Sequence, residues 1–204
     1  MVLPVLANSV EGLDDYSPLM LGLVIGAYGL TQAILQIPLG LLSDRLGRQT
    51  IIRFGLTIFV IGSIVAAFAD SMVDLLIGRA LQGMGAIAST LMALVTDLTI
   101  EDNRSKVMAI IGGSIGSAFI VAMMVGPIIT IYLGLSGVFW MTALLGLVGI
   151  CITFFFMPKI SNPVRNRESG ADIQQIGALL KDRTLTRLNI GIFALHFALS
   201  SSPS

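Results

Sequence analysis

Long runs of uncharged, mostly apolar residues constrain this chain more than any other feature. No charged side chain occurs from 18 to 42 or from 54 to 69, and a short basic stretch at 40–50 joins the two runs. A helix of about 20 apolar residues crosses the hydrocarbon core of a bilayer. Both runs are long enough, or nearly so, and together they predict a transmembrane hairpin.

The composition agrees with a membrane protein. Hydrophobic residues make up 55% of the chain and charged residues 12%, whereas a soluble domain carries about a quarter charged residues. The formal net charge of zero argues against a nucleic-acid partner. The single cysteine, Cys151, lies in an apolar run, so neither an internal disulfide nor a zinc cluster is possible, and we expect it to pack as a small apolar residue.

Charged residues divide the chain into a series of expected spans. Since backbone groups in lipid must satisfy their own hydrogen bonds, each span is expected to be a helix. Residues 1–9 are too short to cross and lack the basic start of a signal peptide, so we interpret them as the tail of a helix whose beginning is missing. The expected spans are a partial one at 1–9 and five more near 18–42, 51–69, 73–98, 106–132 and 135–157.

Three regions are therefore predicted. Residues 1–157 form a transmembrane part, 158–187 a polar linker, and 188–204 the start of a seventh span. Within the linker, apolar residues at helical spacing over 172–182 predict a short amphipathic helix on the membrane surface. That helix is either a strap that couples two halves of a larger protein or a linker segment that happens to be helical.

The distribution of Lys and Arg predicts the orientation. Basic residues occupy alternate connections, and the opposite connections contain acids only, which is the positive-inside pattern. The basic connections are therefore expected on the cytoplasmic side. They contain Arg45, Arg48, Arg53, Arg104 and Lys106, and the linker adds Lys159, Arg165, Arg167, Lys181, Arg183 and Arg187. The remaining basic residue, Arg79, lies inside the fourth span.

Two motifs are specific enough to indicate a family. The stretch from Gly40 to Gln49 matches the pattern G-x-L-a-D-r-x-G-r-k, with Gln49 in place of a basic residue. In the fourth span, Arg79, Gln82 and Gly83 stand in register with a second pattern of the same family. On these motifs the chain resembles the major facilitator superfamily, in particular its drug:H+ antiporters.

The resemblance covers essentially the whole chain and implies an all-α membrane fold. The chain would be the N-terminal six-helix half, with its first helix truncated, of a transporter with twelve spans and a site between two pseudo-symmetric halves. It also implies a multi-pass protein of the cell inner membrane. Expected partners are the bilayer, a small-molecule substrate and the missing C-terminal half. No cofactor, metal or enzymatic activity is expected, and a proton gradient is the expected driving force.

The resemblance also suggests roles for individual residues. Arg79 would be linked to proton transfer and substrate binding, or would instead hold two helices together through backbone carbonyls. A membrane-buried arginine costs about 2.5–3.5 kcal/mol on the insertion scale. Acids and arginines at the basic ends of the spans would form a conformational latch, the alternative being a surface ion cluster of little energetic value. The latch residues are Gly40, Asp44, Arg45, Gly47, Arg48, Asp97 and Arg104.

Further candidates are less specific. Tyr28, Gln32 and Gln36 recur every four residues, so they share one helical face that either lines a central cavity or makes interhelical hydrogen bonds. Gly126-Pro127 remains from an eroded antiporter signature and predicts a helix bend. His196, the only histidine, is a weak candidate for proton coupling.

Two classes of function are consistent with this sequence. The first is a secondary active transporter that exports small, possibly drug-like molecules by alternating access, coupled to proton entry. The second is a truncated or non-transporting membrane protein that packs with a missing second half. The proton-carrying residue is not predicted, because the complete spans contain no intramembrane acid. The substrate is not predicted either, because specificity depends on the shape of a cavity of which the second half would be missing.

Overall fold

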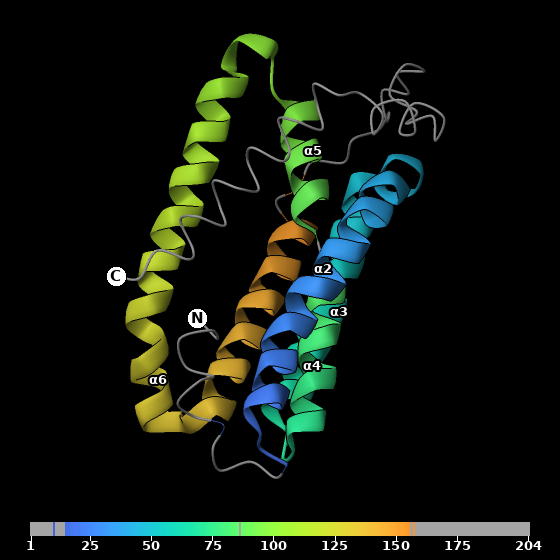
Figure 1. Ribbon diagram of the computed structural model, residues 1–204. Helices are drawn as coiled ribbons and strands as arrows, with labels where there is room; N and C mark the ends of the chain where they lie inside the picture. Colours follow the sequence, from blue (N-terminus) through green and yellow to red (C-terminus); the bar gives the residue numbers. More distant parts are fainter. Residues whose placement is uncertain (1–9, 11–14, 86, 156, 158–204) are drawn as a thin grey trace, which may run out of the picture. The chain divides into compact units, whose positions relative to one another are not determined.

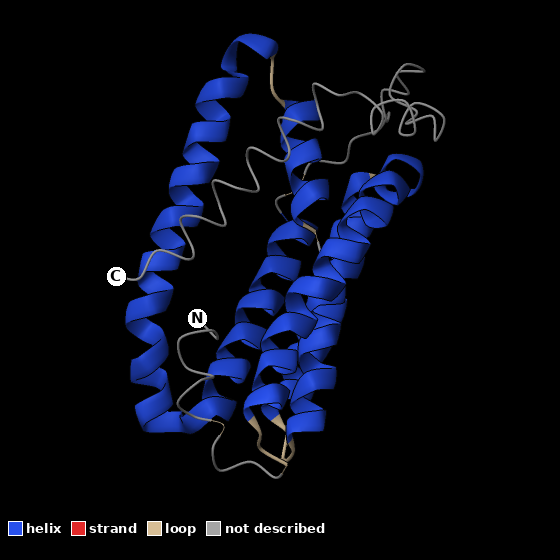
Figure 2. Ribbon diagram, viewed as in Figure 1, coloured by secondary structure: helices blue, strands red, loops and turns tan. Residues whose placement is uncertain are grey.

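The computed structural model describes residues 10, 15–85, 87–155 and 157. The partial span at 1–9, the linker with its amphipathic helix, the seventh span and His196 lie outside them. The described residues form helices and no strand (Figure 2). In chain order these are α2 (Pro18–Leu46), α3 (Arg48–Ala67), α4 (Met72–Met84), α5 (Ala88–Leu98), the short 3-10 helix η1 (Glu101–Asn103) and α6 (Arg104–Phe155) (Figure 1).

Four helical stretches are long and apolar enough to cross a membrane. The last, Glu101–Phe155, has 55 residues, more than twice the length that one crossing needs. It divides at Gly134, whose φ of 67° favours glycine. The break gives a first arm, 104–133, and a second arm, 135–155, and it coincides with the predicted boundary between the fifth and sixth spans.

The predicted span over 73–98 corresponds to Met72–Leu98, a stretch long and apolar enough to cross a membrane, which the structure divides into two helices. α4 ends at Met84 and α5 begins at Ala88. The N–H of Gly85 donates to Gln82 O over 3.2 Å, which closes α4 with a tight last turn. A Cβ atom on Gly85 would lie 2.6 Å from the carbonyl oxygen of Gly55 on α3. This close approach to α3 is a tertiary feature, which hydropathy does not report.

The turn between α2 and α3 is as tight as its glycine suggested. Gly47 has a φ of 94°, and its N–H donates to Ser43 O over 3.0 Å at the end of α2. No residue separates the two helices other than this glycine, so α2 and α3 each extend beyond the predicted spans. The turn places Asp44 of α2 next to Arg48, the first residue of α3.

Small residues bring α3 and α4 into close contact. A Cβ atom on Gly62 would lie 2.6 Å from the backbone nitrogen of Gln82, and one on Gly78 would lie 2.7 Å from Ala66. Such close backbone approach is how helices pack in lipid, where apolar burial alone gives little driving force. The buried cluster nearby contains Val10, Val24, Ala66, Ala67, Met72, Leu75, Val138 and Phe139.

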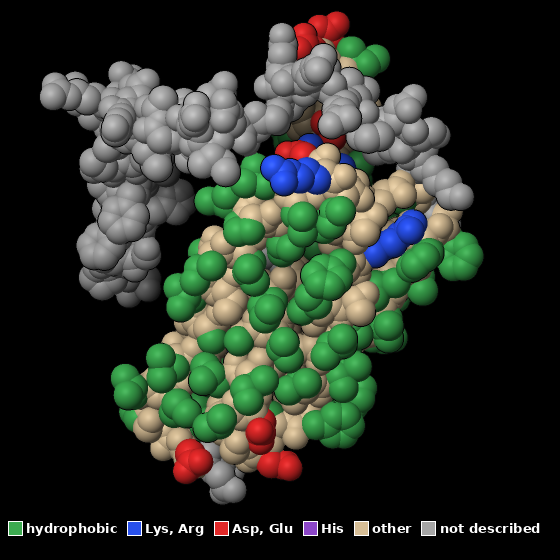
Figure 3. Space-filling model, turned by 90° about the vertical axis from the view of Figure 1, so that its right-hand side faces the viewer, with side chains coloured by type: hydrophobic (Ala, Val, Ile, Leu, Met, Phe, Trp, Pro, Cys, Tyr) green, Lys and Arg blue, Asp and Glu red, His purple; other side chains and the backbone are tan. Residues whose placement is uncertain are grey.

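The two arms of α6 differ in their packing. The second arm lies along α3, where Ser136 Oγ donates to Ala67 O and Gly146 faces Val60. The first arm exposes most of its side chains between 104 and 125. Figure 3 shows hydrophobic side chains over most of the visible face, with Lys and Arg confined to its upper part, as expected for a surface that meets lipid.

Candidate functional site

Arg48 joins the ends of three helices. From the first residue of α3, its Nη1 lies 2.6 Å from Asp44 Oδ1 on α2, and its Nε lies 3.0 Å from Asp97 Oδ2 on α5. Nη1 also donates to Ser43 Oγ over 2.8 Å. The Arg48 side chain is 20% exposed, whereas those of Asp44 and Asp97 are 38% and 50% exposed. We call these three charged residues the latch cluster.

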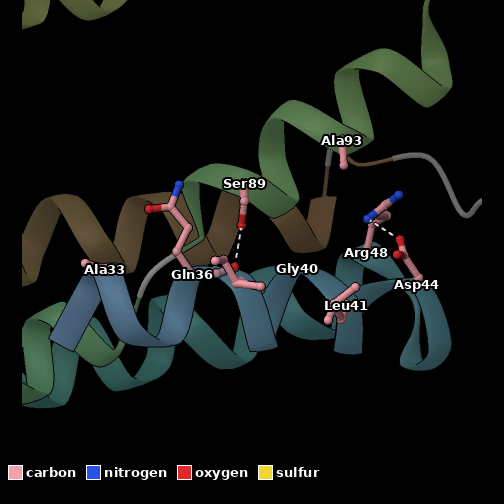
Figure 4. A pocket seen from close by; sticks show the side chains of 9 residues that line it. Ala33, Gln36, Gly40, Leu41, Asp44, Arg48, Ser89 and Ala93 are labelled. Carbon is pink, nitrogen blue, oxygen red and sulfur yellow. Dashed lines mark hydrogen bonds and ion pairs between the residues drawn. The ribbon is translucent and has the colours of Figure 1, made fainter. Parts of the chain in front are cut away.

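An open groove leads to the latch cluster. It has a volume of about 620 Å³ and lies between α2 and α5 (Figure 4). Ser89 Oγ donates to Gln36 O over 3.0 Å and holds the start of α5 against α2. A Cβ atom on Gly40 would lie 3.4 Å from Ser89 Oγ, so a larger residue there would press on α5. The groove is lined by Ala33, Gln36, Ile37, Gly40, Leu41, Asp44, Arg48, Ser89 and Ala93.

The structure places two other predicted latch residues apart from this cluster. Arg104 Nη1 lies 3.7 Å from Glu101 Oε1, in an exposed pair one turn apart. Arg45 is exposed in the last turn of α2, and no carboxylate among the described residues lies within ion-pair distance of it. The described contacts therefore concentrate on Arg48, with Gly40 and Gly47 allowing the helices to approach.

Arg79 lies in a second polar cluster, buried between α2, α3 and α4. Its side chain is stacked on Tyr28, with Cζ 4.4 Å from the ring centroid. Its Nη1 donates to Gln82 Oε1 over 2.8 Å, and Gln82 Nε2 donates to Ser63 Oγ over 2.8 Å. Arg79, Gln82 and Ser63 are 4%, 2% and 0% exposed. No carboxylate in the described part of the chain lies within ion-pair distance of Arg79.

Gly83 brings α4 against α2 beside this cluster. A Cβ atom there would collide with Thr31 Oγ1 and with the carbonyl oxygen of Tyr28. Thr31 Oγ1 lies 2.7 Å from Ala27 O on its own helix, the nearest acceptor for its single hydrogen, and 3.1 Å from Ala80 O across the same interface. Any side chain at position 83 would therefore push Tyr28 away from Arg79.

The polar residues that share one face of α2 lie against more than one neighbouring helix. Tyr28 lies under Arg79, and Gln36 lines the groove next to α5. Gln32 lies between them on the helix and is half-buried. The choice between cavity lining and interhelical hydrogen bonding stays a prediction for the three residues together.

The predicted bend in the fifth span also stays a prediction. α6 keeps helical dihedral angles through Gly126 and Pro127, and its one non-helical residue is Gly134. Thr130 Oγ1 donates to Gly126 O over 2.9 Å within this segment. In the described residues, the sharp change of direction therefore belongs to Gly134.

Sequence reasoning missed two serines that the structure brings into these sites and one arginine that joins two helices outside them. Ser43 and Ser63 were not singled out from the sequence, because their partners, Arg48 and Gln82, are determined by helix packing. Arg53 was interpreted only as an orientation signal. Its Nη2 donates to Thr153 O over 3.0 Å and its Cζ lies 4.2 Å from the centroid of the Phe154 ring, so it fastens the second arm of α6 to α3.

Apolar helices of spanning length, an arginine buried among them and an ion cluster that joins three helix ends define an integral membrane protein of the multi-span helical class. The chain belongs to the major facilitator superfamily, whose family model matches residues 1–204.

Named relatives are membrane transporters. The inner membrane transport protein YajR of Escherichia coli (strain K12) is 50% identical over 202 residues, which are 99% of this chain and 44% of that protein. The uncharacterized transporter BU466 of Buchnera aphidicola subsp. Acyrthosiphon pisum is 38% identical over 200 residues, 98% of this chain and 51% of that protein. A triacylglyceride transporter of Mycobacteroides abscessus is 26% identical over 204 residues, 96% of this chain and 37% of that protein. The chain thus spans about half the length, or less, of these relatives.

Proposed function

We propose that this chain is the N-terminal half of a secondary active transporter that exports small amphipathic molecules against proton entry by alternating access. Membership of the superfamily and the transporter names of the relatives support this proposal. The observation that carries it is the latch cluster, because one arginine holds together helix ends that must separate for a compartment to open at that side.

The energetics of the latch cluster suit a reversible contact. Exposed or half-exposed ion pairs contribute about 0–1 kcal/mol, and both acids here are more than a third exposed. Such a cluster biases the equilibrium between two conformations without locking either. By the positive-inside pattern, the basic ends of the helices face the cytoplasm, so closure of the latch would close the cytoplasmic side in an inner membrane.

Arg79 is proposed as the residue linked to proton movement and substrate binding. A charged side chain within a span is costly and is usually retained for function. Its described partners are an amide and an aromatic ring, and neither neutralises its charge. An anionic group that neutralises it would come from the substrate or from another part of the complete transporter.

The proposed substrate class is amphipathic because the groove between α2 and α5 places apolar side chains beside polar and charged ones. The relative named as a triacylglyceride transporter gives this choice some support, since such a lipid is poorly soluble in water. The groove of α2 and α5 is open on one side, so we propose that the C-terminal half completes the compartment.

The test uses the complete transporter in sealed proteoliposomes with a pH-sensitive dye inside. Amphipathic test compounds are added to proteoliposomes that hold a pH gradient. We expect the compounds to cause release of protons from the lumen, and we expect a protonophore to abolish accumulation of the compounds. Protein-free liposomes are the control. Accumulation that is independent of the gradient would contradict proton coupling, and no movement with any of a broad panel of compounds would favour the alternative of a non-transporting protein.

A further inference from the structure

Ser63 lies outside both sequence motifs, yet the packing of α3 on α4 holds it against Gln82. It is completely buried. The neighbouring Gly62 leaves no space between the helices, since a Cβ atom there would lie 2.6 Å from the backbone nitrogen of Gln82. The hydroxyl group of Ser63 therefore meets the Gln82 side chain at a point where neither helix can move aside.

The direction of each hydrogen bond in this cluster is fixed. Ser63 Oγ donates its only hydrogen to Phe59 O over 2.8 Å, so toward Gln82 it can act only as an acceptor. Gln82 must then present its amide nitrogen to Ser63 and its amide oxygen to Arg79. The reversed amide would place an NH₂ group against the guanidinium, with donors facing donors.

We propose that Ser63 is a positioning residue for Arg79. The backbone carbonyl of Phe59 orients the Ser63 hydroxyl group, and this hydroxyl group orients the Gln82 amide. The amide in turn holds the Arg79 guanidinium over the Tyr28 ring. The proposal rests on the proposed function, in which Arg79 serves transport. Ser63 acts through Gln82 and makes no described contact with Arg79 itself.

Loss of the hydroxyl group has a specific consequence. The amide nitrogen of Gln82 would be left buried without an acceptor, which is unfavourable, and the amide would be free to rotate. Its oxygen, the described hydrogen-bond acceptor of Arg79, would then be held in place less firmly. Because the described residues supply no carboxylate within ion-pair distance, the orientation of the guanidinium would depend mainly on the Tyr28 ring.

The experiment compares two substitutions of equal shape in the complete transporter, Ser63→Thr and Ser63→Val. Threonine keeps the hydroxyl group and adds one methyl group, whereas valine has the same shape as threonine with a methyl group in place of the hydroxyl group. We expect Ser63→Val to transport about fivefold more slowly than Ser63→Thr at equal amounts in the membrane, the loss of roughly one hydrogen bond. Equal rates for the two variants would overturn the proposal.

A matched control separates this effect from ordinary helix back-bonding. Thr57 Oγ1 on α3 donates to Arg53 O, four residues earlier, as Ser63 does to Phe59, but Thr57 is exposed and touches no part of the Arg79 cluster. We expect Thr57→Val to transport at the wild-type rate. A fivefold loss in this control would show that transport slows whenever a side-chain hydroxyl group on α3 loses its hydrogen bond to the backbone carbonyl four residues earlier. That result would overturn the specific role of Ser63.

A second measurement applies if the added methyl group prevents both variants from folding. Ser63→Ala is then compared in the wild-type and Gln82→Met backgrounds by the thermal unfolding of purified protein. We expect the loss in melting temperature to be at least halved in the second background, because Ser63 acts through the amide; equal losses would overturn the proposal. If Arg79→Ala leaves transport unchanged, the proposed role of Arg79 fails as well, whereas failure of the Ser63 comparison alone leaves that role intact.

Discussion

The two arginines at the centre of this account, Arg48 and Arg79, solve the problem of a charge near lipid in opposite ways. Arg48 lies at the helix ends, is 20% exposed and is paired with two partly exposed carboxylates. Arg79 is 4% exposed, and its described partners are a neutral amide and an aromatic ring. Water and ions can compete for the first set of contacts but not for the second. We therefore treat the proposed reversible latch at Arg48 and the buried charge of Arg79 as separate devices.

The largest expected effect is on the buried charge. Arg79→Ala is expected to reduce proton-driven transport to the background of protein-free liposomes, because no other described cation occupies the cluster. Arg79→Lys keeps the charge but loses the planar guanidinium that stacks on Tyr28, so we expect partial activity. The measurement is initial transport rate at matched protein levels; wild-type rates in both variants would remove Arg79 from the mechanism.

The packing beside Arg79 is the next test of the comparison. Gly83→Ala is expected to destabilise the protein by about 1–3 kcal/mol, since the new Cβ atom collides with Tyr28 and Thr31. Gly29→Ala on α2 is the matched control, because no atom lies within 4 Å of a Cβ atom there. Thermal unfolding in detergent measures both. Equal stability of the two variants would mean that α2 and α4 do not pack tightly at Arg79.

A smaller effect is expected at the latch cluster. Asp97→Asn removes a half-exposed partner of Arg48 and should shift the conformational equilibrium by about 1 kcal/mol or less, roughly up to fivefold. The shift is measured as the labelling rate of a cysteine at position 93, in the groove. High salt should produce a similar shift in the wild type by screening. Arg45→Gln, which removes an arginine with no described ion pair, should leave the rate unchanged; a shift as large as that of Asp97→Asn would contradict the assignment.

The smallest effect is expected at Arg104. Its pair with Glu101 has a nitrogen–oxygen distance of 3.7 Å, and the side chains of Arg104 and Glu101 are 45% and 85% exposed. Arg104→Gln should change stability by about 0.5 kcal/mol or less and should not change cysteine labelling in the groove. A labelling change equal to that of Asp97→Asn would place Arg104 in the latch, as the sequence first suggested.

For the described residues, the sequence predicted the stretches of spanning length because charge and hydropathy decide what can enter a bilayer. It did not predict their exact boundaries, since α2 and α3 both extend beyond the predicted spans. The reversal at Gly134 and the turn at Gly47 follow from residues that are visible in the sequence. The break between α4 and α5 does not, because it depends on how closely Gly85 approaches Gly55. The role of Ser63 was hidden for the same reason: a serine in an apolar run acquires a partner only when the register between α3 and α4 is known.

The most direct test of this account measures distances in the complete transporter with pairs of spin labels. One pair, at positions 42 on α2 and 98 on α5, reports on the latch end; the other, at positions 30 on α2 and 77 on α4, reports on the helices that enclose Arg79. We predict that Asp97→Asn lengthens or broadens the first distance distribution and leaves the second unchanged. No change in either pair, or equal changes in both, would contradict the separation of a movable latch from a fixed buried arginine.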